Sequence, residues 1–554
     1  MKYLHLLFFL AICNWGWTQE FDSKRIDELL NEVDPAGPGV IIGVVKDQHL
    51  LHTVSKGMAN LDYNIPINAS SNFRLSSTSK QFTAACILHL VDNKKLNLND
   101  PLVKIFPEFS PSLGKVTVQQ LLNHTSGIRD YMSLMMIQGS RQIDFFNNFI
   151  GNDVDILELI TQQQGLSFES GSAHSYSNTN YWLLGQIIER VSNKSLEKYA
   201  QENIFGPLGM KNSCFAETSG RVIPQRVAGY VSPCPDCERM EYRFQSGVVG
   251  DDGVISSIQD LLFWEQEFYQ HRVLSDQCWE NMLAKGSLNN GEEVSYASGL
   301  IISDFNGERL VKHSGQNPGF SSEILRFPDH HLSIIVLGNQ NWYDIRRYAN
   351  TIAEIFFPPQ NNKAVALTVE KPAAAHLSSA ELERFCGDYH FLETNEYRTV
   401  EKVGAELFYI RNNGPRSKLI PISKTTLIFE DRPHIRLSFS FEADGTKHIE
   451  WEDPTVGNLH ANNYEKVQLD ESKKKTYASQ YSSSELNTTI EIELVENKLV
   501  LQILGQKTPL ETTILDEFVA MGMFTLKFRR NQVDEIIGFR MDAPRAGNIL
   551  FKKN

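Results

Sequence analysis

The sequence predicts an α/β (α+β) layered domain of about 340 residues followed by two small antiparallel β-barrels. Three observations favour this order. Short β-branched runs alternate with helical patterns as far as residue 360. Residues 361–376 then have the loose composition of a linker. Beyond them, period-2 strand patterns divided by turns fill two blocks of about 80 to 90 residues, 377–468 and 469–554, each long enough to close a barrel.

In the first domain, strands are expected near both ends and helices between them. The apolar run VIIGVV at 40–45 predicts a strand, with which 51–59 can pair. Helical patterns occupy 77–90, 117–122, 181–191 and 345–357, and an irregular helical stretch covers 131–165. A glycine-rich loop leads into a helix within 247–264, capped by Ser256 or Ser257. Two strands are predicted within 311–327, on either side of residues 315–319, and a last one at 333–337.

The tail repeats itself weakly. The pentapeptide FCGDY at 385–389 resembles YASQY at 477–481, and alternating strand patterns follow each of them. The alternation is clearest at 436–441 and 490–494, and turns such as Glu496-Asn497 divide the strands. We therefore expect two barrels of similar construction.

Composition and charge are those of a soluble, acidic globular protein. Of the 554 residues, 41% are hydrophobic and 22% are charged, and the net charge is −14. Domains that bind nucleic acid usually carry a basic face, so this charge argues against nucleic acid as a partner. The length predicts two to four domains.

The N-terminus, MKYLHLLFFLAIC, has one lysine followed by a short apolar run, which is the pattern of a secretory signal peptide. We expect residues 1–18 to be the signal, with cleavage near Thr18-Gln19, and the protein to be periplasmic or secreted. An alternative is a lipoprotein cleavage site before Cys13, against which the bulky Ile12 argues. No later apolar run reaches the ~20 residues that a membrane-spanning helix needs.

Seven cysteines occur in the chain, and Cys234 and Cys237 form a lone C-x-x-C. A zinc site would need a second pair of cysteines or histidines nearby, and the sequence has none there. The pair is therefore either a loop disulfide or two idle thiols. Nothing in the sequence requires a metal or an organic cofactor.

Ser77-Thr78-Ser79-Lys80 opens the helix predicted over 77–90. Serine is a weak nucleophile that needs a neighbouring base, and residues three apart share one face of a helix. A lysine serves as that base only when burial or a nearby charge lowers its pKa. The helix N-terminus also offers free backbone N–H groups to an oxyanion. Ser77 is therefore a candidate nucleophile and Lys80 its candidate base.

The same Ser-x-x-Lys spacing recurs at Ser112, Ser195 and Ser472. Ser112 lies beside a proline and near a glycine, Ser195 follows a turn-like cluster, and Ser472 begins a run of lysines. Only Ser77 opens a long helical apolar pattern, so its context rather than its spacing selects it.

Two further motifs follow Ser77 along the chain: Tyr176-x-Asn178 and His313-x-Gly315. Together with FRLSSTSKQFTA, VQQLLNHTSGIRDY, FESGSAHSYSNTNYWLLGQIIE and KHSGQNPGFSS, they make residues 25–360 resemble the penicillin-recognising serine hydrolases. These are the class C β-lactamases, D-alanyl-D-alanine carboxypeptidases, related esterases and D-aminopeptidases. The resemblance implies a β-lactamase/transpeptidase-like fold for 19–360, followed by two lipocalin-like barrels as in D-aminopeptidases.

The resemblance also implies a role for each matched catalytic residue. Ser77 is implied as the nucleophile that becomes acylated, and Lys80 as the group that takes or holds its proton. Tyr176 is implied as the second base or acid, which protonates the leaving group.

For substrate binding, the resemblance implies that Asn178 hydrogen-bonds Lys80 or the substrate amide. The backbone N–H groups of Ser77 and Gln316 are implied as the oxyanion hole. Gly315 is expected to let the substrate backbone approach the strand edge closely.

His313 departs from the lactamase pattern, whose third motif begins with lysine. A lysine is a fixed cation suited to a substrate carboxylate, whereas histidine, with an ordinary pKa near 6.5, is mostly neutral at pH 7. This weakens the case for a penicillin or a C-terminal carboxylate and favours the esterase and D-aminopeptidase branches, which resemble this chain in having histidine here. The likeness to D-aminopeptidases further implies a barrel loop that reaches the site and restricts it to substrates with a free amine.

Two other groups near these motifs have alternative interpretations. His124, in NHTSG, is a tempting base, but in the resembled family it supports the loop beneath the site. Asp251-Asp252 would suit a substrate ammonium, or the pair simply belongs to an acidic surface loop.

The sequence thus predicts an exported serine hydrolase that forms an acyl-enzyme on Ser77 and cleaves small peptide amides or esters, with D-amino-acid peptides favoured. One alternative is a β-lactamase or D-alanyl-D-alanine carboxypeptidase. Another is a non-catalytic penicillin-binding sensor or binding module. The natural substrate, the formation of a homo-oligomer and the influence of the barrels on the active site are left open.

Overall fold

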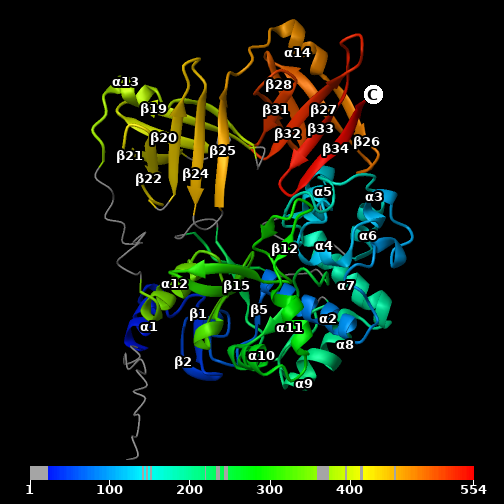
Figure 1. The fold of residues 1–554 in the computed structure, drawn as a ribbon, viewed down its shortest axis with the longest axis vertical. Coiled ribbons are helices and arrows are strands. Elements are labelled where there is room, and N and C mark those ends of the chain that lie inside the picture. The colour runs from blue at the N-terminus through cyan, green and yellow to red at the C-terminus, as the bar shows by residue number, and fades with distance from the viewer. Residues whose placement is uncertain are drawn as a thin grey trace, which may run out of the picture.

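A computed structural model describes residues 23–139, 143–144, 148–149, 153–218, 220–232, 237–242, 247–358, 374–392, 396–411, 416–433, 435–453 and 457–554. The predicted signal at 1–18, Cys13, Cys234 and most of the predicted linker at 361–376 lie outside these residues. Figure 1 shows the two barrels side by side above the first domain. The second barrel lies over the part of that domain that contains α3 (Pro111–Gly114), α5 (Tyr131–Gln138) and α6 (Asp153–Thr161).

A six-stranded antiparallel sheet runs through the first domain. Its strands, in spatial order, are β14 (Ile301–Phe305), β15 (Glu308–Asn317), β16 (Phe320–Phe327), β17 (Leu332–Gly338), β1 (Val40–Lys46) and β2 (His49–Lys56). The hairpin of β1 and β2 was predicted from sequence, as were β15, β16 and β17. The pairing of β1 with β17 joins strands from opposite ends of the domain, which local pattern does not reveal.

Both faces of this sheet are covered. Ile41 and Val45 of β1 belong to the core shared with the central helices, whereas Val40 and Ile42 belong to a second core on the opposite face. Two helices cover that second face: α1 (Ser23–Leu29) and α12 (Ile345–Phe356). Because successive side chains of a strand point to opposite faces, a strand buried on both needs a continuous apolar run such as VIIGVV.

A helical layer covers the other face around α2 (Lys80–Asp92), of which ten of the 13 side chains are buried. The helices packed around it are α7 (Asn178–Ser192), α8 (Leu196–Ala200) and α11 (Asp276–Leu283). A helix that is buried around most of its circumference lies at the centre of the layer and not at its surface. The predicted start at Ser77 is a 3-10 turn, Ser76–Ser79, that leads into α2.

The helix caps follow local sequence signals. Thr117 caps α4 (Val118–Leu122) in a capping box with Gln120. Ser257, rather than Ser256, caps α10 (Ile258–Gln270), because its side chain accepts a hydrogen bond from the Asp260 N–H.

The turn between β15 and β16 is shorter than predicted. β15 continues through Gly315 and Gln316 to Asn317, so only Pro318-Gly319 separates the strands. Gly319 has a φ of 77°, a conformation that glycine adopts without steric cost. The residues assigned to a loop at 315–317 therefore stand on a strand that lines the site.

The tail contains the two predicted antiparallel β structures. The first is a closed barrel of β18 (Gly387–Phe391), β19 (Glu396–Val403), β20 (Glu406–Arg411), β21 (Arg416–Pro421), β22 (Thr426–Phe429), β23 (Arg436–Phe441), β24 (Lys447–Asp453) and β25 (Gly457–Tyr464). The second is a nearly closed nine-stranded sheet of β26 (Ser479–Ser483), β27 (Thr488–Val495), β28 (Lys498–Ile503), β29 (Gln506–Pro509), β30 (Glu511–Thr512), β31 (Glu517–Ala520), β32 (Phe524–Arg530), β33 (Ile536–Ala543) and β34 (Ala546–Lys553). The predicted fold of the tail is confirmed.

The sequence repeat corresponds to the same local structure in both barrels. A short helix, α13 (Ser379–Glu383) or α14 (Glu471–Tyr477), comes before the first strand. The Tyr389 hydroxyl donates to the Phe385 carbonyl at 2.8 Å, and the Tyr481 hydroxyl donates to the Tyr477 carbonyl at 2.8 Å. Each tyrosine thus buries its ring while its hydroxyl is satisfied at the bend that precedes the strand.

The two barrels differ in how they pack. The apolar core of the second barrel is continuous with that of the helical layer, whereas the first barrel has a core of its own. The Tyr397 hydroxyl of the first barrel donates to the Glu517 carboxylate of the second at 2.5 Å. The second barrel is therefore packed as an extension of the first domain.

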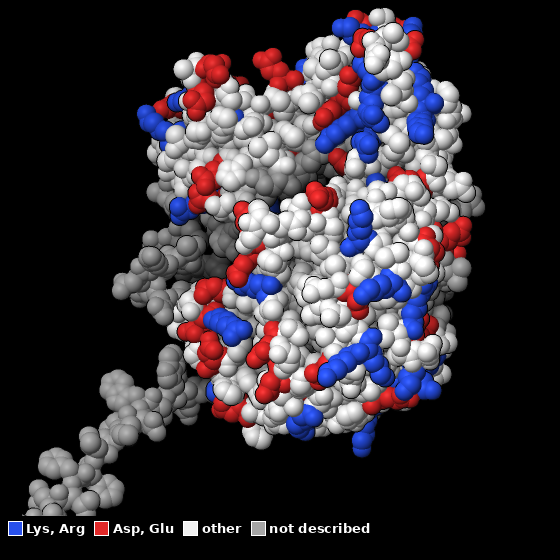
Figure 2. Space-filling model, turned by 45° about the vertical axis from the view of Figure 1, so that its right-hand side comes forward, with Lys and Arg blue, Asp and Glu red and all other residues white. Residues whose placement is uncertain are grey.

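Outside the site, the described residues show no concentration of one charge on the face in Figure 2, no candidate membrane span and no candidate metal site. Figure 2 shows acidic and basic side chains interspersed over one face of the molecule. No helix among the described residues is long and apolar enough to cross a bilayer, and no group of three or more potential metal ligands occurs there. Cys237 is disulfide-bonded, which supports the first of the two alternatives for the C-x-x-C motif.

Candidate active site

Ser77 lies in the 3-10 turn Ser76–Ser79, which hydrogen bonds to a short neighbouring strand hold in place. The Leu75 N–H donates to the Val254 carbonyl at 2.9 Å, and the Val254 N–H donates to Ser79 Oγ at 3.0 Å. These bonds tie the turn to β11 (Val254–Ser256). The Ser77 side chain stays partly exposed at the wall of a pocket of about 570 Å³.

Gly315 allows this turn to pack directly on β15. A Cβ atom at position 315 would lie 2.2 Å from the Leu75 carbonyl oxygen and 3.0 Å from the Ser76 Cβ atom. Ser322 Oγ, on β16, donates to the same Leu75 oxygen at 2.6 Å. From sequence we expected the glycine to admit the substrate backbone, but the contact that the structure shows is with the backbone that carries the nucleophile.

Lys80, the first residue of α2, is fully buried and directs its amine at Ser77. Its Nζ donates to Ser77 Oγ at 3.3 Å, to Asn178 Oδ1 at 3.0 Å and to the Asp251 carbonyl at 2.6 Å. An ammonium has three protons to donate, so these acceptors satisfy it completely. A neutral amine in the same place would accept the Ser77 proton.

Asn178 and Tyr176 reach Lys80 from the start of α7. The Asn178 N–H donates to Asp130 Oδ2 at 2.7 Å, which orients the helix end that presents the Asn178 side chain to Lys80. The Lys80 ammonium lies 4.9 Å from the centroid of the Tyr176 ring, a cation–π distance. Ser77, Asn178 and Tyr176, predicted from separate motifs, thus line one pocket, and Lys80 is buried directly behind it.

We expect Tyr176→Phe to lower kcat/KM for an amide substrate by about 10²–10⁴-fold, the usual contribution of a general acid or base. The ring would keep its contacts with Lys80 and with His124, whose centroid is 4.3 Å away. The loss should be larger for D-alanine p-nitroanilide than for p-nitrophenyl acetate, because nitrophenolate leaves without a proton. Steady-state kinetics would measure both. Equal losses on the two substrates would contradict leaving-group protonation, and Tyr63→Phe at an exposed position serves as the matched control.

His124 is buried beneath the loop that carries Tyr176. Its Nδ1 accepts from the Ser177 N–H at 3.3 Å and lies 3.0 Å from Asn180 Nδ2. Burial, and then the nearby Lys80 charge, hold its pKa well below the ordinary value. A neutral ring bonded to this loop favours support of the loop over catalysis by His124.

His313 is likewise buried and neutral. Its Nδ1 donates to the Ser314 carbonyl at 2.7 Å, because a carbonyl can only accept, and its Nε2 therefore accepts from the Tyr296 hydroxyl at 2.9 Å. Burial, reinforced by the Lys80 charge, lowers the pKa of His313 to about 3. The residue at the third motif is thus a neutral group at physiological pH and does not replace the missing lysine cation.

This burial predicts a pH dependence of stability. His313 binds a proton in the unfolded chain below pH 6.5 but not in the native state until about pH 3, so its contribution to the unfolding free energy is lost as pH falls through this window. Between pH 6.5 and 5, the loss should be about 2 kcal/mol, at 1.4 kcal/mol per pH unit. Urea unfolding should show that His313→Gln removes this part of the acid destabilisation. Parallel curves for the two proteins would refute the prediction, and His49→Gln at an exposed position is the matched control.

Asp251 and Asp252 do not form an acidic surface loop. Asp251 is buried, accepts from the Tyr131 hydroxyl at 3.0 Å, and has its pKa raised to about 6 by burial against the opposing effect of the Lys80 charge. Asp252 pairs with Arg74 at 3.2 Å. Asp251 therefore holds the lysine through its carbonyl and is one of the residues that line the pocket.

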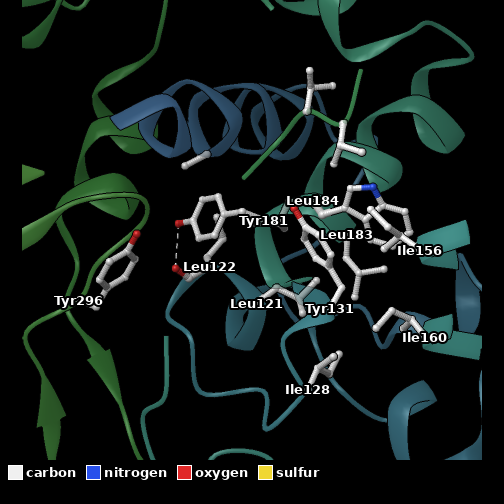
Figure 3. Close-up of a cluster of buried hydrophobic side chains, with 14 of the residues drawn as sticks. Leu121, Leu122, Ile128, Tyr131, Ile156, Ile160, Tyr181, Leu183, Leu184 and Tyr296 are labelled. Carbon is white, nitrogen blue, oxygen red and sulfur yellow. Dashed lines mark hydrogen bonds between the residues drawn. The ribbon is translucent and has the colours of Figure 1, made fainter. Parts of the chain in front are cut away.

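Three tyrosines that support the site, Tyr131, Tyr181 and Tyr296, were not predicted from sequence. Figure 3 shows Tyr181 between Tyr131 and Tyr296, with its hydroxyl directed at the Leu122 carbonyl, to which it donates at 2.9 Å. Tyr131 and Tyr181 stand inside quoted motif blocks, so their position was a usable signal. Tyr296 lies in no motif and is identified only by its bond to His313.

The outer edge of β15 is open along the pocket. β14 begins, at Ile301, opposite Lys312, so among the described residues the segment from His313 to Asn317 is paired only with β16. Gln316 is exposed on this segment and lines the same pocket as Ser77. A free strand edge can bind an extended peptide. The oxyanion role of the Ser77 and Gln316 N–H groups stays a prediction.

The second barrel completes the pocket wall. The turn between β33 and β34 places Arg545 among the lining residues, and the guanidinium carbon lies 5.0 Å from the centroid of the Tyr176 ring. The Asp130 N–H donates to the Arg545 carbonyl at 2.9 Å. Whether the barrels touch the site could not be read from sequence, and the structure shows that one of them does.

A partly exposed serine, hydrogen-bonded to a buried lysine and flanked by a tyrosine, defines a site suited to acyl transfer through serine. Residues 25–353, more than half of the chain, match the sequence model of the family described as beta-lactamase. The chain belongs to the beta-lactamase family.

Named relatives support this assignment. Penicillin-binding protein 4* of Bacillus subtilis (strain 168) is 33% identical over 311 residues, which are 52% of this chain and 66% of that protein. A D-aminopeptidase of Gluconobacter oxydans (strain 621H) is 28% identical over 309 residues, 55% of this chain and 56% of its own length. This chain therefore covers less than two thirds of either relative.

A solved structure extends the likeness in fold. The octameric penicillin-binding protein homologue from Pyrococcus abyssi has a TM-score of 0.56 and 22% sequence identity, and the match covers 79% of this chain and 100% of that one. The fold predicted from the motifs is thereby confirmed.

Proposed function

We propose that this protein is a serine hydrolase that forms an acyl-enzyme on Ser77 and cleaves small peptide amides or esters, with D-amino-acid peptides as favoured substrates. The observation that carries the proposal is the buried Lys80 amine, 3.3 Å from Ser77 Oγ and beside the Tyr176 ring. We further propose that it acts after export, in the periplasm or outside the cell, as the N-terminal sequence indicates.

In this mechanism Ser77 Oγ attacks the substrate carbonyl carbon while its proton passes to Lys80. The oxyanion of the tetrahedral intermediate accepts from the N–H groups of Ser77 and Gln316. The bond to the leaving nitrogen or oxygen then breaks, and Tyr176 supplies the proton that the leaving group takes. Water then attacks the acyl carbon and gives a proton to the Tyr176 oxygen. The bond to Ser77 Oγ breaks, and Ser77 takes its proton back from Lys80 as the acid leaves.

The preference for D-amino-acid peptides rests on two main observations, to which the neutral His313 adds a third. One is the set of relatives named D-aminopeptidase, among them that of Gluconobacter oxydans. The other is the open edge of β15 beside the pocket, which suits an extended peptide. The neutral His313 argues for the same branch, because a fixed cation is missing from the position where lactamases have lysine.

A penicillin-directed activity is the second candidate, because the relative at 33% identity is named a penicillin-binding protein. A panel of D-alanine p-nitroanilide, nitrocefin and p-nitrophenyl acetate separates the two. We expect the anilide and the ester to be turned over and nitrocefin to react slowly or not at all. A long-lived adduct with labelled penicillin and no turnover of the other substrates would favour a sensor and reject the proposed hydrolase.

A further inference from the structure

We propose that Arg545, from the second barrel, binds a carboxylate on the leaving group of the substrate, so that the enzyme prefers peptides that end one residue beyond the scissile bond. This inference rests on the proposed function and names its substrate class. It differs from the restriction to a free amine that the likeness to D-aminopeptidases implies, because a guanidinium repels an ammonium and attracts a carboxylate. It also revises the expectation, drawn from the missing lysine at position 313, that a terminal carboxylate is disfavoured, because the cation comes from the second barrel instead of β15.

The hairpin that carries Arg545 is docked firmly on the first domain. Arg129 donates to the Gly547 carbonyl and to the Asn548 carbonyl, each at 2.8 Å. The Gly547 N–H donates to Ser167 Oγ at 3.0 Å. Arg129 is itself buried and pairs with Glu485 of the second barrel at 3.1 Å. The tip is therefore a preorganised wall of the pocket, and little ordering is required when a ligand binds.

The guanidinium of Arg545 is available to an anion. Its side chain is exposed in the pocket and stacks over Tyr176, and no hydrogen bond or ion pair of that side chain is found among the residues described. The acids around it have hydrogen-bond or ion-pair partners of their own: Asp130 with the N–H groups of Met132 and Asn178, Asp251 with Tyr131, Asp252 with Arg74, and Asp542 with Lys527. The Arg545 side chain acts on the nearby Asp130 carboxylate through its charge, which opposes the rise in the Asp130 pKa caused by burial. The other arginine of the pocket, Arg346, already lies 3.6 Å from Glu323.

The Arg545 guanidinium lies on the side of the site where the leaving group of the substrate departs. Tyr176 is the residue proposed to protonate the leaving group, and the Arg545 guanidinium carbon is 5.0 Å from the centre of its ring. A leaving amino acid carries its carboxylate only one carbon from the departing nitrogen. The same contact that places the nitrogen at the Tyr176 hydroxyl can therefore bring the carboxylate to Arg545.

The backbone conformation of Arg545 permits substitutions that change its charge without disturbing the turn. Its φ of 62° lies in the left-handed region, which asparagine and aspartate tolerate better than most residues. Arg545→Asn and Arg545→Asp therefore remove or reverse the charge without demanding a new turn. Arg529→Asn, at an exposed position of β32 that does not line the pocket, is the matched control.

The primary test is binding, measured by calorimetry on the full chain with Ser77→Ala, so that it does not depend on turnover. The probes are D-alanylglycine and D-alanylglycinamide, which differ only in the terminal carboxylate. We expect the acid to bind more tightly than the amide. Adding Arg545→Asn should weaken binding of the acid about tenfold, as for loss of a charged hydrogen bond, and leave the amide within twofold.

The same pair of peptides then tests catalysis with Ser77 intact. Arg545→Asn should lower kcat/KM for D-alanylglycine about tenfold and spare the amide, and Arg545→Asp should invert the preference. Equal effects on acid and amide, no effect on either, or no binding of D-alanylglycine would overturn the inference. Failure of the proposed function looks different: the acid would bind with the expected dependence on Arg545, but neither peptide would be cleaved.

Discussion

Ser77→Ala should eliminate acylation and reduce hydrolysis of every substrate by about 10⁵-fold or more, the scale seen when a serine nucleophile is removed. The side chain points into the pocket and makes its one described bond with Lys80, so the folded structure should survive the change. A fluorophosphonate probe followed by intact-protein mass spectrometry would measure labelling, and D-alanine p-nitroanilide would measure turnover.

The chain supplies its own control for this experiment. Ser472 begins the same Ser-x-x-Lys spacing, but it is exposed at the start of α14 and donates to Asp470 at 2.8 Å. Ser472→Ala should leave labelling and turnover unchanged. If labelling persisted in Ser77→Ala, another residue would be the nucleophile and the assignment of the site would be wrong.

Lys80→Met should lower kcat/KM by about 10²–10⁴-fold, because it removes the group placed to take the serine proton. Methionine has a similar length and no basic nitrogen, so it tests the chemistry rather than the space. The Asp251 carbonyl and Asn178 Oδ1 would each lose a donor, which costs about 1–3 kcal/mol per unsatisfied buried group. Stopped-flow acylation with p-nitrophenyl acetate would report the loss.

Two controls show whether a loss of activity in Lys80→Met reflects lost chemistry or lost structure. A thermal melt of Lys80→Met shows whether the protein is folded at the assay temperature. Lys198→Met, in the surface tetrad at Ser195, is the matched control, because Ser195 merely caps α8. A folded Lys80→Met protein that is acylated at the wild-type rate would show that another group deprotonates Ser77.

The local features of the fold could be predicted because their causes are local. A strand buried on both faces needs an unbroken apolar run, as at 40–45, and a helix start needs a side chain such as Thr117 to accept its free N–H groups. The spacing of Ser77 and Lys80 determines their contact for the same reason, since three residues bring two side chains to one face of a turn. The turn at 315–319 was misjudged because glycine there indicated a loop, whereas Gly315 stands within β15 to make room for Leu75.

The candidate site was predictable as a set of motifs but not as a geometry. Motif order identified Ser77, Lys80, Tyr176, Asn178, His313, Gly315 and Gln316, all of which the fold brings to or beside one pocket, apart from Lys80 buried behind it. It gave no indication of Tyr296 or of the burial of Asp251. Those depend on which segments pack against each other, and side chains distant in sequence leave no periodic trace.

By itself, the sequence determined that this chain would place a serine beside a lysine at the start of a buried helix. It also determined a histidine, in place of a lysine, at the third motif, and two β-barrels after the first domain. Only the tertiary structure decided that the second barrel forms part of the pocket and brings Arg545 over Tyr176. The physical reason is that the first set of features depends on neighbours along the chain. The second depends on the docking of one folded unit on another, through contacts such as Arg129 with Glu485, which no local pattern encodes.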